Sequence, residues 1–317
     1  MPIKPPRLNP GDTIGIISPA SAPHDPKNFD RSIDILQRLG FRAKLARHAR
    51  RRWGFLAGSD RQRAADIMAM FTDPMVKAIV CVRGGYGTAR LLPLLDYATI
   101  RAHPKIFVGY SDITSLHCAF LRRAGLVSFH GPMLNSDFVK QDFPQFAWES
   151  FRRTLTRAAA PGSLCQGYKA KTVSILRPGS ASGPLLGGNI SILCTTLGTP
   201  WQPSFKNRIL FFEDLDEEPF RFDRMLTHLL NAGLLQQVAG VAIGINKNCK
   251  DPNARKAREY RQTMDDVFKE RLLPLGVPVV AGLPFGHVRF NATLPIGVRA
   301  TLDATNGDLL ITESAVA

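Results

Sequence analysis

Residues 105–121 read KIFVGYSDITSLHCAFL, and this stretch predicts the class of fold. The apolar run Lys105–Val108 predicts a buried strand, residues 109–112 a tight turn, and the apolar spacing of Ile113–Leu121 a helix. Such a turn lifts Ser111 above the carboxyl edge of a parallel sheet, where open α/β sheets place their sites. The beginning of a helix can stabilise a developing oxyanion, but Ser111 or Asp112 at this point can also act only as a helix cap. Both interpretations are open from this stretch alone.

The same alternation of strand and helix extends toward the amino terminus. Strands are predicted at Thr13–Ser18, Phe41–Leu45 and Lys77–Val82, with a helix at Asp30–Leu39 and a second helix capped by Ser59 or Asp60. Repeated strand–helix units predict an α/β fold with a parallel, Rossmann-like sheet and helices on both faces.

The composition changes near residue 160. We interpret residues 1–160 as an N-terminal Rossmann-like domain, residues 161–182, rich in small residues and proline, as a linker with an uncertain strand at Thr172–Leu176, and residues 183–317 as a C-terminal α/β domain. In the second domain we expect helices at Ile190–Leu197, Pro219–Leu230 and Arg258–Leu273, and strands at Arg208–Phe212, Val238–Ile245, Val277–Ala281, Leu294–Leu302 and Leu309–Thr312.

The composition excludes several classes of protein. The chain has 317 residues, of which 44% are hydrophobic and 21% charged, ordinary values for a globular protein. Five cysteines, an odd number with no CxxC pair, indicate a reducing compartment rather than a disulfide framework or a zinc site. No apolar run approaches the ~18 residues of a membrane span or the length of a signal peptide. We therefore expect a cytoplasmic protein that makes no contact with the membrane.

Basic residues outnumber acidic ones, 41 to 26, which gives a net charge of +15. This charge fits either a polyanionic partner, such as nucleic acid, or a solvated basic surface. The densest cluster, Lys44 to Arg52, has no interleaved aromatic residues of the kind that stack on single strands. We therefore favour the solvated surface and expect no specific nucleic-acid partner.

A serine nucleophile needs a base to accept its proton and an acid to orient that base. Of the seven histidines, His287 lies in a loop after the strand Val277–Ala281, where catalytic bases are often placed. His117 points about 120° away from Ser111 on the same predicted helix, at 100° per residue. His130 can border the same cleft, and we expect His228 to be packed inside a helix. Taken alone, His287 is equally compatible with a structural role.

Glu213 and Asp214 directly follow the apolar strand Arg208–Phe212. A carboxylate at a buried strand end needs a partner, and a histidine N–H is a suitable one. A solvated acidic loop leading into the next helix is the alternative, and it explains residues 216–218 better than Glu213.

The glycine-rich sequence RGGYG at 83–87 follows the strand Lys77–Val82. It is neither a GxGxxG motif nor a Walker loop, so nucleotide binding is weakly supported. Glycines let backbone N–H groups approach a reacting centre, so this loop can supply an oxyanion donor. No spacing of His, Cys, Asp and Glu indicates a metal site, and we expect neither a metal nor a cofactor.

The order of these motifs resembles the LD-carboxypeptidase family, which includes muramoyl-tetrapeptide carboxypeptidases and microcin C self-immunity peptidases. The resemblance covers nearly the whole chain. It is carried by PGDTIGIISPAS, RGGYGTARLLPLLDY, FVGYSDITSLH, VSFHGPM, GPLLGGNISILCTTLGTPW, ILFFEDLDEEPFRFDRMLTHL and GLPFGHVRFNATLPIGVRATLD.

The resemblance implies a Ser–Glu–His triad formed by Ser111, Glu213 and His287, placed at the junction of the two domains. It also implies an oxyanion hole built from the backbone N–H of Asp112 and that of Gly84 or Gly85. The implied reaction releases D-alanine from cytoplasmic murein tetrapeptide in cell-wall recycling, without a cofactor, and members usually form homodimers.

Two other functions remain open. Immunity-type members cleave peptidyl or aminoacyl nucleotide conjugates with the help of an added loop carrying a stacking aromatic residue. We find no such insertion, and Trp148 and Trp201 are more typical of packing residues. A non-catalytic, polyanion-binding protein on an inherited hydrolase fold is the second alternative, suggested by the +15 charge.

Overall fold

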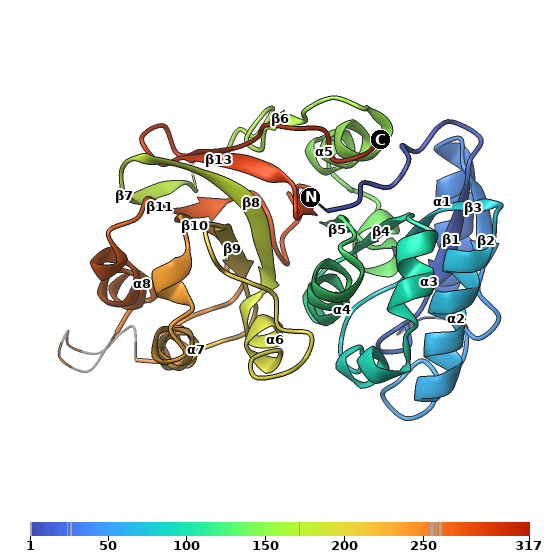
Figure 1. The fold of residues 1–317 in the computed structure, drawn as a ribbon, viewed down its shortest axis with the longest axis horizontal. Coiled ribbons are helices and arrows are strands. Elements are labelled where there is room, and N and C mark those ends of the chain that lie inside the picture. Colours follow the sequence, from blue (N-terminus) through green and yellow to red (C-terminus); the bar gives the residue numbers. More distant parts are fainter. Residues whose placement is uncertain are drawn as a thin grey trace.

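The computed structural model describes residues 2–23, 25, 27–170, 172–253, 257, 259 and 262–317. Two sheets stand side by side, with the N-terminal half of the chain, from blue to green, on one side and the C-terminal half, from yellow to red, on the other (Figure 1). The α/β class and the arrangement of two sheet-containing halves agree with the prediction from the sequence.

The first sheet has six strands in the order β12-β5-β4-β3-β1-β2. They are β1 (Thr13–Ile17), β2 (Arg42–Leu45), β3 (Val76–Cys81), β4 (Ile106–Gly109), β5 (Ser128–His130) and β12 (Leu294–Ile296). The first five run parallel, as the strand–helix alternation predicts, while β12 pairs with β5 in the antiparallel sense. The carboxyl ends of the parallel strands therefore share one edge of the sheet.

Helices connect the strands of the first sheet. They are α1 (Lys27–Arg38), α2 (Asp60–Thr72), α3 (Tyr97–Ala102), α4 (Thr114–Ala119) and, after β5, α5 (Gln145–Thr156). Ser59 rather than Asp60 caps α2, because its side chain accepts from the N–H of Gln62 and Gln62 bonds back to it. Helix α4 continues into a π-helical turn at Phe120–Ala124, which ends at Gly125 with φ +63°.

The second sheet has eight strands in the order β6-β14-β13-β8-β9-β10-β11-β7. They are β6 (Gly162–Ser163), β7 (Ser174–Arg177), β8 (Ser180–Asn189), β9 (Ile209–Glu213), β10 (Gly240–Gly244), β11 (Val279–Leu283), β13 (Arg299–Asp303) and β14 (Asp308–Ile311). Strands β8 to β11 form the parallel centre, and the outer strands pair in the antiparallel sense. Helices α6 (Ile190–Thr195), α7 (Pro219–Asn231) and α8 (Met264–Leu272) pack near this centre (Figure 1).

Four details differ from the expectations drawn from the sequence. Residues 161–182 do not only connect the halves: they contribute β6, β7 and the first residues of β8, and the mostly exposed pattern of β7 explains its weak signal. The expected strand Leu294–Leu302 divides at Gly297, with φ +92°, into β12 and β13, which join different sheets. The expected helix 258–273 begins at Met264, and residue 258 lies outside the described residues. His228 is exposed on α7 rather than packed.

One apolar core runs through both halves. Strands β1, β4, β9 and β10 are buried along their whole length, as expected for central parallel strands. All five cysteines carry free thiols. Among the helices of the described residues, none combines the length and the apolar character needed to cross a bilayer.

Candidate active site

Ser111 follows β4 in a tight turn that leads into α4. Its φ is +64°, in the left-handed region that costs a non-glycine residue about 1–2 kcal/mol. The side chain makes no hydrogen bond to any other described residue, and no side-chain cap precedes α4. The capping interpretation of Ser111 is therefore wrong, and its hydroxyl is available at the edge of the sheet.

The turn that carries Ser111 is tied to the glycine-rich loop through Asp112. The Asp112 carboxylate accepts a hydrogen bond of 2.9 Å from the N–H of Thr88, and the Thr88 hydroxyl donates to the Asp112 carbonyl. The same hydroxyl lies 2.7 Å from the Ser115 hydroxyl on α4. Burial raises the pKa of the Asp112 carboxyl, although these hydrogen bonds oppose the shift. The role of Thr88 in fixing two loops together has no signal in the sequence.

Gly84 is the glycine of this loop that lies against Ser111. A Cβ atom at Gly84 would lie 3.0 Å from the Ser111 hydroxyl oxygen and 3.3 Å from the backbone nitrogen of Asp112. A Cβ atom at Gly85 would instead lie 2.4 Å from the Ser21 hydroxyl oxygen. Of the two glycines considered as oxyanion donors, Gly84 has the closer approach to Ser111.

Glu213 is the last residue of β9, and its carboxylate contacts His287. Its Oε2 lies 2.7 Å from Nδ1 of His287 and accepts a second hydrogen bond, of 3.2 Å, from the His287 backbone N–H. Gly286, with φ +117°, allows this approach, because a Cβ atom there would lie 2.9 Å from Oε2. Glu213 is fully buried, and its Oε1 has no hydrogen-bond partner within the described ranges. The interpretation of Glu213 as part of a solvated loop is therefore wrong.

The surroundings of His287 act on its pKa in opposite directions. Burial lowers the pKa, but the charge of Glu213 and its hydrogen bond outweigh burial, so the pKa of His287 lies above its ordinary value. The ring of Tyr110 packs edge-on against the imidazole, with 4.9 Å between the ring centroids. With Glu213 accepting from Nδ1–H, Nε2 is left as the free nitrogen that can act as a base.

Asp214, the next residue, supports the neighbouring backbone instead of the histidine. Its carboxylate accepts hydrogen bonds from the Asn189 side chain at 2.8 Å and from the N–H of Ser191 at 3.0 Å. Both partners lie at the junction of β8 and α6. The two adjacent carboxylates therefore have separate structural roles, which the acidic run in the sequence does not distinguish.

Ser111 and His287 line the same hollow, of about 230 Å³, at the meeting of the two sheets' strand ends. Arg83, Gly84, Tyr110 and Leu215 also line it. A neighbouring hollow of about 450 Å³ shares Arg83, Tyr110, Leu215 and His287, so the two form one cleft. The structure thus brings together Ser111, Glu213, His287, Asp112 and Gly84, which come from four separate stretches of the sequence.

Two other histidines near this cleft are buried. His117 lies 2.9 Å from the Gly109 carbonyl through Nε2 and 2.8 Å from the Ser128 hydroxyl through Nδ1, and burial lowers its pKa to about 4. His130 packs among Tyr110, Phe211 and Phe285, and burial holds its pKa well below the ordinary value. Both rings are therefore neutral parts of the core.

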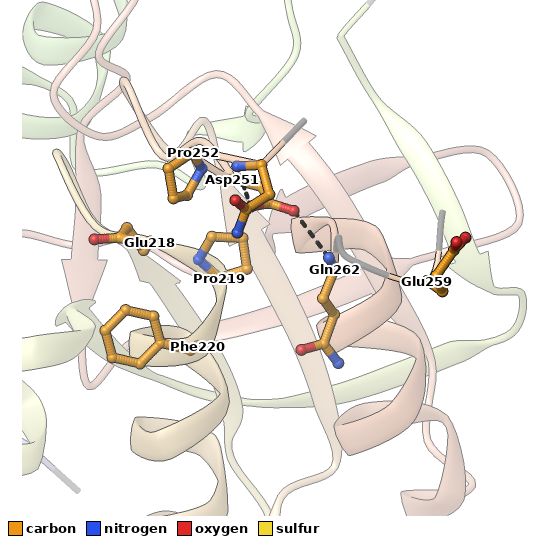
Figure 2. A pocket seen from close by; sticks show the side chains of 8 residues that line it. Glu218, Pro219, Phe220, Asp251, Pro252, Glu259 and Gln262 are labelled. Carbon is orange, nitrogen blue, oxygen red and sulfur yellow. Dashed lines mark hydrogen bonds between the residues drawn. The ribbon is translucent and has the colours of Figure 1, made fainter. Parts of the chain in front are cut away.

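A further hollow lies beside the beginning of α7 and contains none of the candidate residues (Figure 2). Its Asp251 carboxylate accepts from the backbone N–H groups of Asn253 and Gln262, at 2.8 and 2.9 Å. Glu218 and Glu259 also line it. Across the described residues no group of three or more His, Cys, Asp and Glu side chains is arranged to hold a metal ion.

Two family models match the chain. The LD-carboxypeptidase N-terminal domain matches residues 14–131, and the LD-carboxypeptidase C-terminal domain matches residues 182–302. The first match ends just after β5 and contains Ser111, whereas the second contains Glu213 and His287.

Individual relatives extend the similarity to the whole chain. A probable murein peptide carboxypeptidase of Bacillus subtilis is 39% identical over 97% of this chain and 94% of its own length. The solved muramoyltetrapeptide carboxypeptidase of Oxalobacter formigenes superposes with a TM-score of 0.81, at 33% identity over 94% of this chain and 97% of that one. The microcin C7 self-immunity protein MccF in complex with aspartyl sulfamoyl adenosine gives a TM-score of 0.89, at 28% identity and full coverage of both chains.

Proposed function

Because the chain belongs to the LD-carboxypeptidase family and is therefore a peptidase, we propose that it is a serine carboxypeptidase that releases the terminal D-alanine from cytoplasmic murein tetrapeptide in cell-wall recycling. One observation carries the proposal. Ser111 and His287 face one hollow from different sheets, while buried Glu213 lies 2.7 Å from the far nitrogen of His287. A serine–histidine–acid triad requires a buried acid bonded to one nitrogen of the histidine and a serine beside the same cleft, and these placements support the proposal.

In the first half of the proposed reaction, Nε2 of His287 accepts the Ser111 proton while the serine oxygen attacks the carbonyl carbon of the scissile amide. The backbone N–H groups of Asp112 and Gly84 donate to the resulting oxyanion. His287 then gives its proton to the amide nitrogen, the C–N bond breaks, and D-alanine leaves as the free amine. Glu213 stabilises the imidazolium and keeps its Nδ1–H directed inward.

In the second half, water replaces D-alanine in the hollow. His287 accepts a proton from this water as its oxygen attacks the acyl-serine carbonyl. Collapse of the second tetrahedral intermediate returns the proton to Ser111 and frees the tripeptide. No step needs a metal ion or a cofactor.

Two observations favour a peptide over a nucleotide conjugate as substrate. Of the two tryptophans considered as base-stacking residues, half-buried Trp148 stacks on Phe151, with 5.8 Å between the centroids, and also contacts Phe138. Trp201 is likewise half-buried and packs against the core. Tyr110 also lines the cleft, but its ring is buried beside His287. A base-stacking site of the expected kind is therefore not formed by these residues.

The basic cluster gives little support to polyanion binding. Within it Lys44 pairs with Asp73, Arg50 pairs with Asp30, and His48 lies 2.8 Å from Asp66. These pairs neutralise part of the local charge and favour the solvated-surface interpretation.

The proposal is tested by incubating the protein with synthetic L-Ala-γ-D-Glu-diaminopimelate-D-Ala and, separately, with aspartyl sulfamoyl adenosine. We expect mass spectrometry to show release of D-alanine from the tetrapeptide and much slower cleavage of the nucleotide conjugate. Faster cleavage of the conjugate would favour the immunity-type function instead. Cleavage of neither, with no fluorophosphonate labelling of Ser111 and with salt-sensitive DNA binding, would favour the polyanion-binding alternative.

Replacing Gly84 with alanine is expected to lower kcat/KM for the tetrapeptide about 10²-fold, the cost of misplacing a catalytic group by about 1 Å. Alanine keeps the backbone N–H, but its methyl carbon would lie 2.9 Å from Ser111 Cβ and 3.0 Å from the Ser111 hydroxyl oxygen, so Ser111 or the glycine-rich loop must shift. Steady-state kinetics measure the loss of activity, and thermal melting shows whether the variant is folded. An unchanged kcat/KM in a folded variant would show that the reaction does not depend on the close approach of Gly84 to Ser111.

A further inference from the structure

The cleft around Ser111 is positively charged. Arg83, Lys140 and Lys247 line its larger part, and Arg83 also lines the hollow that contains Ser111. Among the described residues, no aspartate or glutamate lines either hollow. An anionic ligand is therefore the class of molecule that this cleft attracts.

Arg83 differs from the two lysines in its position and in its partners. It immediately precedes Gly84, so it is the cation nearest in the chain to the glycine that lies against Ser111. Its one hydrogen bond within the described part of the chain is a long contact of 3.4 Å from Nη1 to the Ala22 carbonyl, and no carboxylate pairs with it there. Lys140, in contrast, lies 3.9 Å from the Asp137 carboxylate, and Lys247 lines only the larger hollow.

The surroundings of Arg83 make an unpaired cation unfavourable. Burial and the neighbouring Arg52 both lower the pKa of its guanidinium. A partly buried arginine is usually stabilised by a carboxylate, whose two oxygens match its planar N–H groups. Within the described residues this arginine has no such partner, so a ligand that carries a carboxylate would supply what the protein does not.

A peptide cleaved at Ser111 carries a carboxylate at the required place only if the scissile bond is its last one. Between the scissile carbonyl and the terminal carboxylate lie only the amide nitrogen and one α-carbon. We propose that Arg83 binds the α-carboxylate of the leaving D-residue, and so restricts cleavage to the end of a peptide. This inference rests on the proposed function and adds to it the residue that selects a free C-terminus.

The physical basis is a difference between two substrates. A terminal carboxylate would form a bidentate, charge-assisted ion pair with Arg83. An internal peptide bond or a terminal amide would leave the guanidinium facing a neutral group. Sites built to bind a polar group discriminate strongly against analogues that lack it, because their own polar atoms then remain unpaired.

The experiment compares Arg83→Gln with the wild type on two substrates, the tetrapeptide and the same peptide ending in D-alaninamide. We expect the wild type to favour the free acid by about 10²-fold or more in kcat/KM, and Arg83→Gln to bring this ratio close to one. Arg83→Lys, which keeps the charge but not the planar guanidinium, should retain part of the preference for the free acid over the amide.

Lys247→Gln is the matched control, because it removes the same charge from the same cleft but not from the hollow of Ser111. It should lower kcat/KM for both substrates by the same factor. If the wild type releases D-alanine but Arg83→Gln keeps the full preference for the free acid, or folded Arg83→Gln loses both substrates equally, the assignment of Arg83 is wrong and the proposed function stands. If the wild type cleaves neither substrate, the proposed function and the assignment fail together.

Discussion

Ser111→Ala is expected to lower kcat/KM for release of D-alanine from murein tetrapeptide by about 10⁴- to 10⁶-fold, as loss of the nucleophile does in other triad hydrolases. The change removes one oxygen that makes no hydrogen bond to another described residue, so the fold has little to lose from it. Fluorophosphonate labelling should disappear together with the activity. Equal activity of variant and wild type would show that Ser111 is not the nucleophile.

Ser111→Gly supplies a matched control that also tests the backbone geometry. Glycine removes the same hydroxyl but tolerates φ +64°, whereas alanine does not. We therefore expect both variants to be inactive, but Ser111→Gly to be more stable than Ser111→Ala by about 1 kcal/mol. Thermal melting should show a difference of about 2 °C for a chain of this size. Equal melting temperatures would argue against strain at this turn.

Glu213→Gln is expected to lower kcat about 10³- to 10⁴-fold, because the amide no longer stabilises the imidazolium and can face Nδ1 with its N–H₂ group. That contact favours the wrong tautomer of His287, with the proton on the nitrogen that should act as the base. The shape of the buried side chain is conserved, so the effect arises from charge and hydrogen bonding. Steady-state kinetics at a fixed pH measure this loss of kcat relative to the wild type.

The pH profile separates this effect from a general structural fault. In the proposed mechanism the neutral form of His287 is the base, so kcat/KM of the wild type should rise with pH through a midpoint above ~6.5, the ordinary histidine pKa. In Glu213→Gln the attraction that raises the pKa of His287 is gone while its burial remains, so the midpoint should move to lower pH. Asp216→Asn, which removes an exposed charge from the same loop, should leave the midpoint in place. A midpoint unchanged in Glu213→Gln would contradict the proposed pairing.

The parallel first sheet could be predicted from the sequence because its strands are short apolar runs, each followed by a helical pattern. It also indicated the three candidate side chains, since Glu213 lies at the end of a strand and Ser111 and His287 lie in turns that follow strands. Local patterns alone left a structural role open for Ser111 and for His287, because a strand end can equally carry a helix cap or a packed side chain. The order of the motifs along the chain then connected these candidate residues with one family.

Other features had no local signal. Strand β7 is mostly exposed, so its alternation is weak, and β12 is three residues long and joins a sheet formed by the opposite end of the chain. His228 has leucines beside it in the sequence, yet it occupies the exposed face of α7. The positive φ of Ser111 and the tie between Thr88 and Asp112 depend on contacts across the fold, which periodicity does not encode.

The pairing of β12 with β5 has a consequence for how the protein is made. On the ribosome, the first five strands of the N-terminal sheet are complete long before residues 294–296 emerge, so β5 remains an open edge until those residues have been made. Ser111 likewise exists for most of translation without Glu213 or His287. In the proposed mechanism, a chain that stops before His287 therefore contains the nucleophile without its base and cannot cleave a peptide.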